Sequence, residues 1–345
     1  MIAILKREWK SYFQNITGWL FIAAVLALYG LYFLAYNLRA GYPYVSYTLS
    51  AISFIMLIAV PILTMRSMAE ERHSRTDQLV LTAPVSLGKM IFGKFLAMVG
   101  VFTVAVAVIA VTPLVLAAFG TVPMGENYVA VLGFWLYGCT CIAVGMLASA
   151  LTESQVIAAV VAFAFLFLGY MMNSITGLIG DHLITKVLGA YDLYTPLQSF
   201  MSGCLDLTGV VYFVSVTALC LFLTCQCVQK RRWSMTTKKL TTGMFSVAMI
   251  VVGFAVAVAV NMVVKEMPSS WTAVDATSTK LYSLTDTTKD YVKNLSQDVT
   301  IYVLSSEKSA DSTLAETLQR YEDLSKHLNV VYKDPAKSPN FYQQY

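Results

Sequence analysis

The sequence predicts an all-α polytopic membrane protein, in which a six-helix bundle is followed by a seventh anchor helix and a small extracytoplasmic α/β domain. Apolar residues make up 57% of the chain and charged residues 13%, a balance outside the range of soluble globular domains. The charged residues stand in blocks, and they separate apolar stretches near the roughly 20 residues that a membrane-spanning helix needs. From Lys265 onward charged and hydroxyl residues dominate, which predicts a change from membrane to aqueous surroundings.

The first predicted element is an amphipathic helix over residues 1–16. Trp9 and Tyr12 are typical interfacial anchors, so we expect this helix to lie along the inner leaflet of the membrane. Its apolar side chains recur at helical spacing opposite four charged ones, those of Lys6, Arg7, Glu8 and Lys10.

Seven apolar spans follow, of which the first six form a predicted six-span domain over residues 17–228. A basic linker over residues 229–242 separates it from the seventh span, and Pro113 is expected to kink the third. The predicted spans cover residues 17–36, 48–66, 89–118, 129–150, 155–177, 208–228 and 243–264.

The distribution of Lys and Arg predicts the orientation of the chain. Thirteen of these residues lie in the segments on one side of the membrane, whereas the short loops on the other side hold only Arg39 and Lys186. The positive-inside rule therefore predicts a cytoplasmic N-terminus, and an odd number of spans then puts residues 265–345 outside.

The segment from Met65 to Val85 is the longest run of mixed charge in the first 228 residues. We expect the second span to continue through it as a helix in water until Thr82–Pro84, because the residue before a proline avoids the α region. Such a helix could be held by a soluble partner, and the alternative is a solvated loop that obeys the positive-inside rule. The candidate coupling residues are Glu70, Glu71, Arg72, Arg75, Thr76, Asp77 and, in the next inner loop, Glu153.

The outer loop over residues 178–207 is too long for a turn and too amphipathic for a tether. We expect its apolar residues to lie on the outer leaflet as interfacial helices, either as a lid over the bundle or as a gate. These residues are Leu183, Val187, Leu188, Tyr191, Tyr194 and Phe200.

The C-terminal segment predicts a β-α-β unit. Residues 299–304 are rich in β-branched side chains, residues 314–328 carry leucines at helical spacing, and residues 330–332 form a second short strand. So little apolar surface predicts an incomplete domain.

Several classes of protein are disfavoured. The cores of the spans contain no ionisable residue, which argues against an ion-coupled transporter. Gly88–Phe95 imitates a phosphate-binding loop, but Phe95 stands where the Mg²⁺-binding Ser or Thr is required, so we expect no nucleotide or metal cofactor in this chain. No basic patch with interleaved aromatic residues indicates nucleic-acid binding, and no catalytic set is apparent. The two Cys-x-Cys pairs, at 139–141 and 225–227, leave copper export as a minor alternative.

The charged segment resembles the cytoplasmic signature of ABC-2-type permeases, in which Glu-Glu-Arg-x-x-Gly-Thr-x-Glu-Leu-Leu leads to a proline and the third span. Here Met68–Arg72, Thr76 and Leu79–Pro84 fit, whereas Arg75 replaces Gly and Gln78 replaces Glu. The resemblance implies that residues 67–82 are a coupling helix and that the N-terminal helix is the elbow helix of the family.

A second resemblance concerns the rest of the chain. The end of the gliding-motility-type permease is similar to three segments of this chain, Phe200–Leu207, Val211–Phe213 and Arg231–Trp233. The start of the auxiliary domain of that family is similar to Ser278–Thr285. This implies a permease fused to the first part of an auxiliary subunit, in a chain that looks partial.

The resemblance implies a multi-pass exporter subunit in a bacterial plasma membrane, working on an unknown substrate. Its expected partners are the bilayer, a separate cytoplasmic ABC ATPase that binds ATP and Mg²⁺, and a second permease copy in a homodimer or pseudo-dimer. The alternative is a non-transporting complex that transmits ATP-driven motion to an envelope partner.

Overall fold

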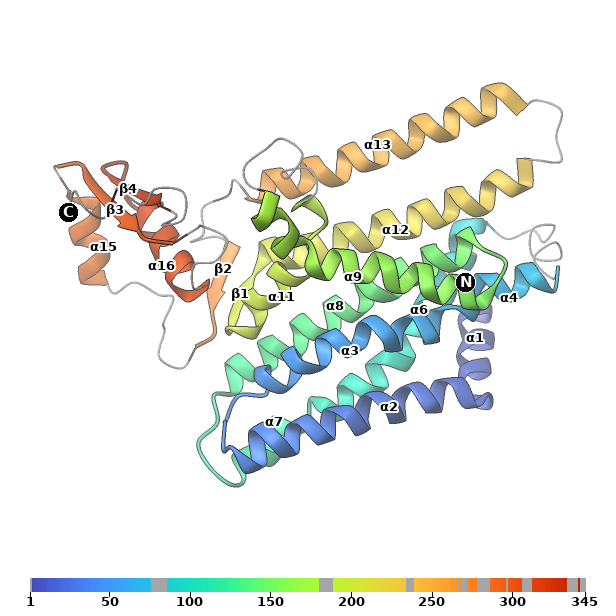
Figure 1. Ribbon diagram of the computed structural model, residues 1–345, viewed down its shortest axis with the longest axis horizontal. Helices are drawn as coiled ribbons and strands as arrows, with labels where there is room; N and C mark the ends of the chain where they lie inside the picture. Colours follow the sequence, from blue (N-terminus) through green and yellow to red (C-terminus); the bar gives the residue numbers. More distant parts are fainter. Residues whose placement is uncertain are drawn as a thin grey trace.

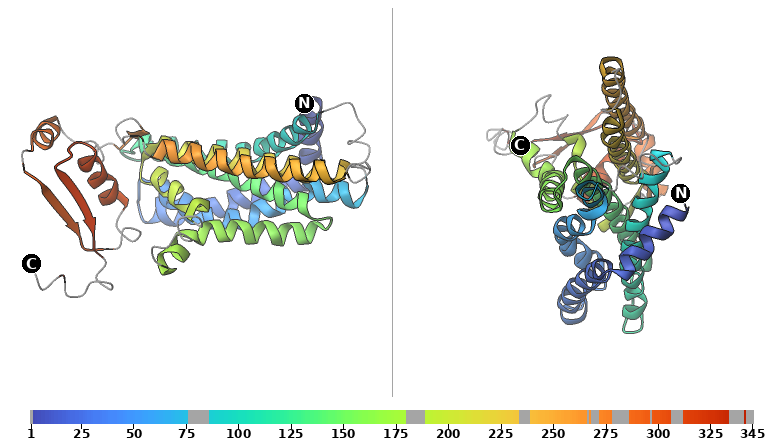
Figure 2. Two further views of the ribbon diagram at one scale, coloured as in Figure 1. Left: turned by 90° about the horizontal axis from the view of Figure 1, so that it is seen from above. Right: turned by 90° about the vertical axis from the view of Figure 1, so that its right-hand side faces the viewer.

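A computed structural model describes residues 2–75, 86–179, 189–233, 239–265, 267, 272–277, 286–295, 297–305, 312–333 and 341. Within these residues, seven helices are long and apolar enough to cross a membrane, as the sequence predicts. They run side by side in one bundle, and a small unit with two strands and two helices lies beyond one end of it (Figures 1 and 2).

The N-terminal half of the bundle starts with the amphipathic helix α1, which lies across the ends of its neighbours (Figure 1). A helix forms here as the sequence predicts, and it ends at Gln14 rather than at residue 16, whereas its position along the inner leaflet stays a prediction. The elements in order are α1 (Ile2–Gln14), α2 (Ile16–Phe33) with a π-helical extension η1 (Leu34–Arg39), α3 (Ser46–Thr64), α4 (Arg66–His73), α6 (Leu87–Ile109) and α7 (Thr112–Ala117).

The third span is broken as expected near Pro113. Helix α6 ends at Ile109, and α7 begins at Thr112 with the proline in its first turn, where the missing N–H leaves no helical hydrogen bond unmade. The Tyr29 hydroxyl lies 2.6 Å from the Thr112 hydroxyl and ties this break to α2.

The remaining elements begin with α8, the most buried helix of the bundle, which packs on α3, α6, α9, α11 and α12. They are α8 (Met124–Leu151), α9 (Gln155–Ile179), η2 (Gly189–Tyr191), α11 (Tyr194–Met201), β1 (Cys204–Asp206), α12 (Leu207–Trp233), α13 (Lys239–Lys265), β2 (Ala273–Asp275), α15 (Asp286–Lys293), β3 (Val299–Val303), α16 (Ser312–Glu322) and β4 (Leu328–Tyr332).

Glycines let the neighbours of α8 come close. A Cβ on Gly145 would lie 2.3 Å from Thr64 Oγ1, and a Cβ on Gly138 would lie 2.2 Å from the Phe102 ring. Small residues have this role at helix contacts in membranes, where dispersion contacts rather than the hydrophobic effect hold helices together.

The segment before α12 differs from the prediction. Tyr194 is partly exposed at the start of α11, but Leu197 and Phe200 are fully buried in the bundle rather than on a leaflet surface. The predicted interfacial residues Leu183, Val187 and Leu188 lie outside the described residues.

The predicted linker over residues 229–242 is shorter than expected, because α12 continues to Trp233 and α13 starts at Lys239. The α13 helix packs along α12, where Asn261 Nδ2 donates to Ser215 Oγ at 2.7 Å. The predicted β-α-β unit is confirmed: β3 and β4 pair in parallel, with Val299 opposite Leu328, and α16 connects them.

Candidate functional site

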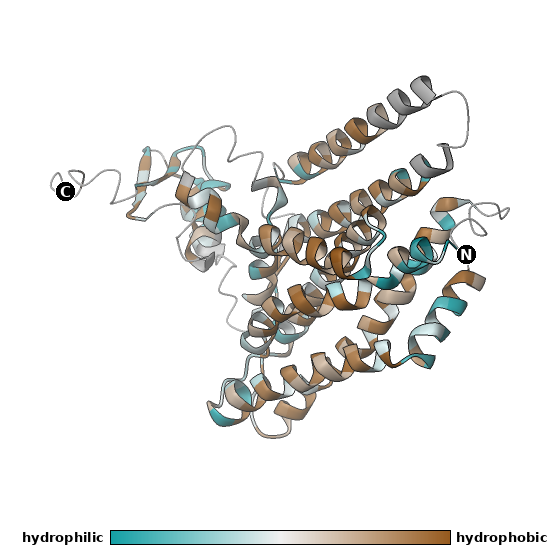
Figure 3. Ribbon diagram, turned by 45° about the vertical axis from the view of Figure 1, so that its right-hand side comes forward, coloured by the Kyte–Doolittle hydropathy of each residue, from teal (hydrophilic) through white to brown (hydrophobic). Residues whose placement is uncertain are grey.

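The charged helix α4 continues the second span almost without interruption. Only Met65 separates it from α3, and Met65 itself has helical backbone angles (φ −55°, ψ −33°). The hydrophilic residues of α4 and α1 gather at one end of a largely hydrophobic bundle (Figure 3). A displacement of α4 along its axis would therefore be carried directly into α3.

A serine of α8 caps the first turn of α4. Ser149 Oγ accepts hydrogen bonds from the amides of Met68 and Ala69, both at 3.1 Å, and donates to the Met65 carbonyl at 3.0 Å. The first amides of a helix have no partner within the helix, so this hydroxyl satisfies groups that burial would otherwise leave unpaired. The cap fixes α4 to α8, and the sequence analysis missed it because Ser149 stands inside an apolar span.

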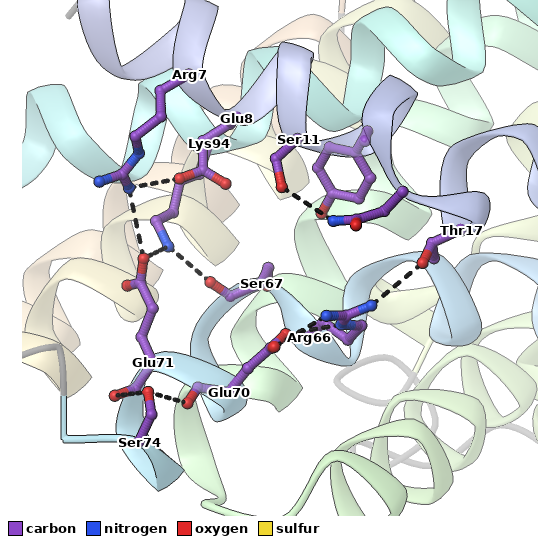
Figure 4. A pocket seen from close by; sticks show the side chains of 12 residues that line it. Arg7, Glu8, Ser11, Thr17, Arg66, Ser67, Glu70, Glu71, Ser74 and Lys94 are labelled. Carbon is purple, nitrogen blue, oxygen red and sulfur yellow. Dashed lines mark hydrogen bonds and ion pairs between the residues drawn. The ribbon is translucent and has the colours of Figure 1, made fainter.

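The second attachment of α4 is an ion pair with a buried lysine of α6 (Figure 4). Lys94 is only 3% exposed, and its Nζ lies 2.6 Å from Glu71 Oε1 and donates to the Ser67 carbonyl at 2.8 Å. Glu71 Oε1 also lies 3.6 Å from Arg7 Nη2, and that nitrogen lies 2.6 Å from Glu8 Oε1. This chain of charges joins α4 to α6 and α1.

Two further ion pairs involve the candidate coupling residues. Arg66 makes a bidentate pair with Glu70, at 2.7 and 2.9 Å, within α4. Arg72 Nη2 lies 2.8 Å from Glu153 Oε1, and its Nη1 donates to the Leu151 carbonyl at 3.3 Å. The structure thus brings Arg72 and Glu153 together, although they are 81 positions apart in the sequence.

A polar pocket of about 520 Å³ lies among α1, α2, α4 and α6. Burial raises the pKa of Tyr12, and the hydrogen bond to Glu8 raises the pKa of Arg7, so both groups keep their protons at neutral pH. The pocket is lined by Arg7, Glu8, Ser11, Tyr12, Asn15, Thr17, Arg66, Ser67, Glu70, Glu71, Ser74 and Lys94 (Figure 4).

The end of α4 corrects the sequence-based expectation. The helix stops at His73 and does not continue unbroken to Thr82, because Arg75 adopts a left-handed conformation with φ 56°. Glu71 and Arg72 are half-buried, so the exposed residues at this end, among those that the structure describes in this segment, are His73, Ser74 and Arg75. Thr76 and Asp77 lie outside the described residues.

Arg75 occupies the position at which many helices end with glycine. Its amide donates to the Arg72 carbonyl at 3.2 Å, the bond that a left-handed residue makes just after a helix. The related sequence signature has Gly at this position, and the backbone angle gives the physical reason. We expect Arg75→Gly to stabilise the protein by about 1 kcal/mol, because glycine removes the steric cost of a Cβ at positive φ.

The matched control is Arg75→Ala, which removes the same charge but keeps the Cβ. Unfolding of both variants by SDS in mixed micelles gives the comparison. Equal effects of the two substitutions would show that the charge, not the backbone angle, determines the stability at this position.

The sequence matches two families. The first is described as ABC-2 family transporter protein and covers residues 40–228, more than half of the chain. The second is a domain of unknown function (DUF7088) over residues 278–345, and Ser278 is also the first residue of the segment that resembles the start of an auxiliary domain. No curated protein is similar enough to the chain to count as a match. With seven apolar helices and a match over its permease region, the chain belongs to the ABC-2 transporter family and is a multi-pass membrane component of an ABC system.

Proposed function

We propose that this protein is the permease subunit of an ABC-2-type exporter in a bacterial plasma membrane, driven by a separate cytoplasmic ATPase. One observation carries the proposal: a short charged helix with an exposed end is fixed to three other helices of the bundle, α8, α6 and α1. ATP and Mg²⁺ would bind to the ATPase, and a second permease copy would complete the transporter. The excess of Lys and Arg on one side supports a cytoplasmic N-terminus and an extracytoplasmic C-terminal unit.

The attachments of α4 suggest how motion would enter the bundle. When the ATPase moves, it pushes on the exposed residues His73–Arg75, and α4 passes the displacement to α3 through Met65. The Ser149 cap and the Glu71–Lys94 pair would make α8 and α6 follow, so that the inner end of the bundle moves as one body. In this scheme the position of α4 is held by its ion-pairing residues, Glu70, Glu71, Arg72 and Glu153. The contact with the ATPase would be made by Arg75, together with Thr76 and Asp77, which follow it in the sequence.

A charge reversal at the exposed end tests this proposal. We expect Arg75→Glu to reduce the amount of ATPase that co-purifies with the tagged full chain roughly tenfold, because a close charge contact across an interface is lost and replaced by repulsion. Arg39→Glu is the control, since Arg39 is also exposed but lies on η1 at the other end of α2. Normal co-purification of the Arg75→Glu variant, or an equal loss in the control, would contradict docking at α4.

The second candidate function is a membrane complex that transmits ATP-driven motion to an envelope partner without transport. The pairing of β1 with β2 favours it, because this sheet joins the bundle to the segment before the C-terminal unit. The finer assignment to the gliding-motility kind, with a fused auxiliary domain, rests on the sequence resemblance, and the family match that starts at residue 278 supports only a separate C-terminal unit. ATP hydrolysis without vectorial release of any lipid or peptide from reconstituted vesicles would favour this candidate over the exporter.

A further inference from the structure

The chain returns to the helical bundle after α13. Strand β2 pairs with β1 in antiparallel fashion, with Cys204 opposite Asp275 and Asp206 opposite Ala273 (Figure 1). β1 lies inside the region that matches the ABC-2 family, and β2 lies between that region and the second family match. The two parts of the protein are therefore joined by a sheet as well as by the covalent chain.

The contact extends beyond the two strands. The Ala276 amide donates to the Gly203 carbonyl at 3.2 Å, and the Ala276 carbonyl oxygen lies so close to Gly125 that a Cβ there would be 2.6 Å away. A Cβ on Gly203 would lie 2.8 Å from Glu126 Cγ and 3.3 Å from the Thr277 methyl group. Residues 272–277 thus touch both β1 and the start of α8.

β1 is a direct continuation of the buried helix α11. Gly203 makes the turn between them with φ 83°, a conformation that favours glycine, and its amide donates to the Phe200 carbonyl at 3.1 Å. Phe200 is 0% exposed, and a Cβ on Gly133 or Gly209 would lie 2.3 or 2.8 Å from its side chain. The end of α11 is therefore inserted between α8 and α12. Its last residue, Met201, lies three residues before Cys204, the first residue of β1.

We propose that residues 272–277 act as a strap that keeps Phe200 seated in the bundle. Through this strap, the C-terminal unit and α11 move together, so that the position of the C-terminal unit is coupled to the opening of this end of the bundle. A two-stranded sheet of three residues is weak by itself, and it can detach while α13 stays on α12 through Asn261 and Ser215. The proposal is independent of the ATPase contact, which concerns the other end of the bundle.

Breaking the sheet is the first test. Because Gly203 and Ala276 form a hydrogen-bonded pair, the alternation of an antiparallel ladder directs the N–H of Val274 toward β1. Val274→Pro removes this donor, and Val274→Ala keeps it and serves as the control. We expect hydrogen exchange at residues 194–206 to become roughly tenfold faster in the proline variant only, because local opening costs less free energy. Unchanged exchange in a folded proline variant would overturn the proposal.

Strengthening the sheet is the second test, and it compares two forms of one variant, so that any effect of the substitution itself cancels. Asp275→Cys places a thiol opposite Cys204, at the separation that facing residues have in a non-hydrogen-bonded pair. Val274→Cys is the control, since successive residues point to opposite faces of a strand. A protease site introduced between residues 234 and 238 divides the chain into one fragment with Cys204 and another with residue 275. A disulfide then keeps the two fragments together under denaturing conditions unless a reductant is added.

The oxidised and reduced forms of the Asp275→Cys protein then give the comparison. We expect hydrogen exchange over residues 194–201 to be roughly tenfold slower in the oxidised form, because the strap can no longer detach. Failure to form the disulfide, or a disulfide that leaves exchange in α11 unchanged, would overturn the proposal even if Val274→Pro does not fold.

Discussion

The substitution Glu71→Gln is expected to lower the free energy of unfolding by about 3–5 kcal/mol, because it leaves the buried ammonium group of Lys94 without its carboxylate. Lys94 is 3% exposed, and the distance of 2.6 Å to Glu71 leaves no room for water between the two groups. Gln keeps the shape of Glu71 but supplies no charge. Unfolding in mixed micelles with SDS measures the change.

The neighbouring glutamate is a matched control. Glu70 pairs with Arg66, and these side chains are 44% and 37% exposed, so we expect Glu70→Gln to cost less than about 1 kcal/mol. Lys94→Met in the Glu71→Gln background is expected to restore most of the stability, because it removes the buried charge that lost its partner. Similar losses for both glutamates, or no recovery with Met, would show that the Lys94 pair does not fix α4.

The substitution Phe200→Ala is expected to have a comparable effect, a loss of about 3–5 kcal/mol. The ring fills the space that Gly133 and Gly209 leave open, and it lies 6.2 Å from the Phe213 ring, centroid to centroid. Since Tyr137 and Phe213 are themselves fully packed, the neighbours have little freedom to fill the cavity. The same unfolding assay measures the loss, and hydrogen exchange shows whether α11 leaves the bundle.

Phe119→Ala is the corresponding control for this substitution. Phe119 is 82% exposed in the segment between α7 and α8, so its removal is expected to change the stability by about 0.5 kcal/mol or less. A result for Phe200→Ala as small as that of the control would mean that the ring is not a packed part of the bundle.

The sequence predicted the elements that depend on local patterns. The length and apolarity of the spans, the amphipathic face of α1 and the β-branched residues of β3 are properties of short segments, so they can be recognised without knowledge of the fold. The break before α7 follows from Pro113 for the same reason. The related signature also contained information about Arg75, because a Gly at that position indicates a positive φ.

The contacts that hold the candidate site together could not be predicted in this way. Lys94 is one of many basic residues that flank an apolar span, and only the fold brings it to Glu71. Ser149 and Phe200 look like ordinary residues of apolar segments, although one caps α4 and the other closes a gap between helices. The early end of α4 depends on a backbone angle at Arg75 that a residue-by-residue propensity for helix does not contain.

Helix α8 spans about 42 Å, at 1.5 Å per residue for its 28 residues. Its first turn touches Ala276, and its last turn carries Ser149. If a molecule that binds at the Ala276 end shifts α8 and thereby changes the affinity of a partner at α4, thermodynamic reciprocity requires that this partner change the affinity of that molecule by an equal factor. Helix α8 would then couple binding at one end of the bundle to binding at the other.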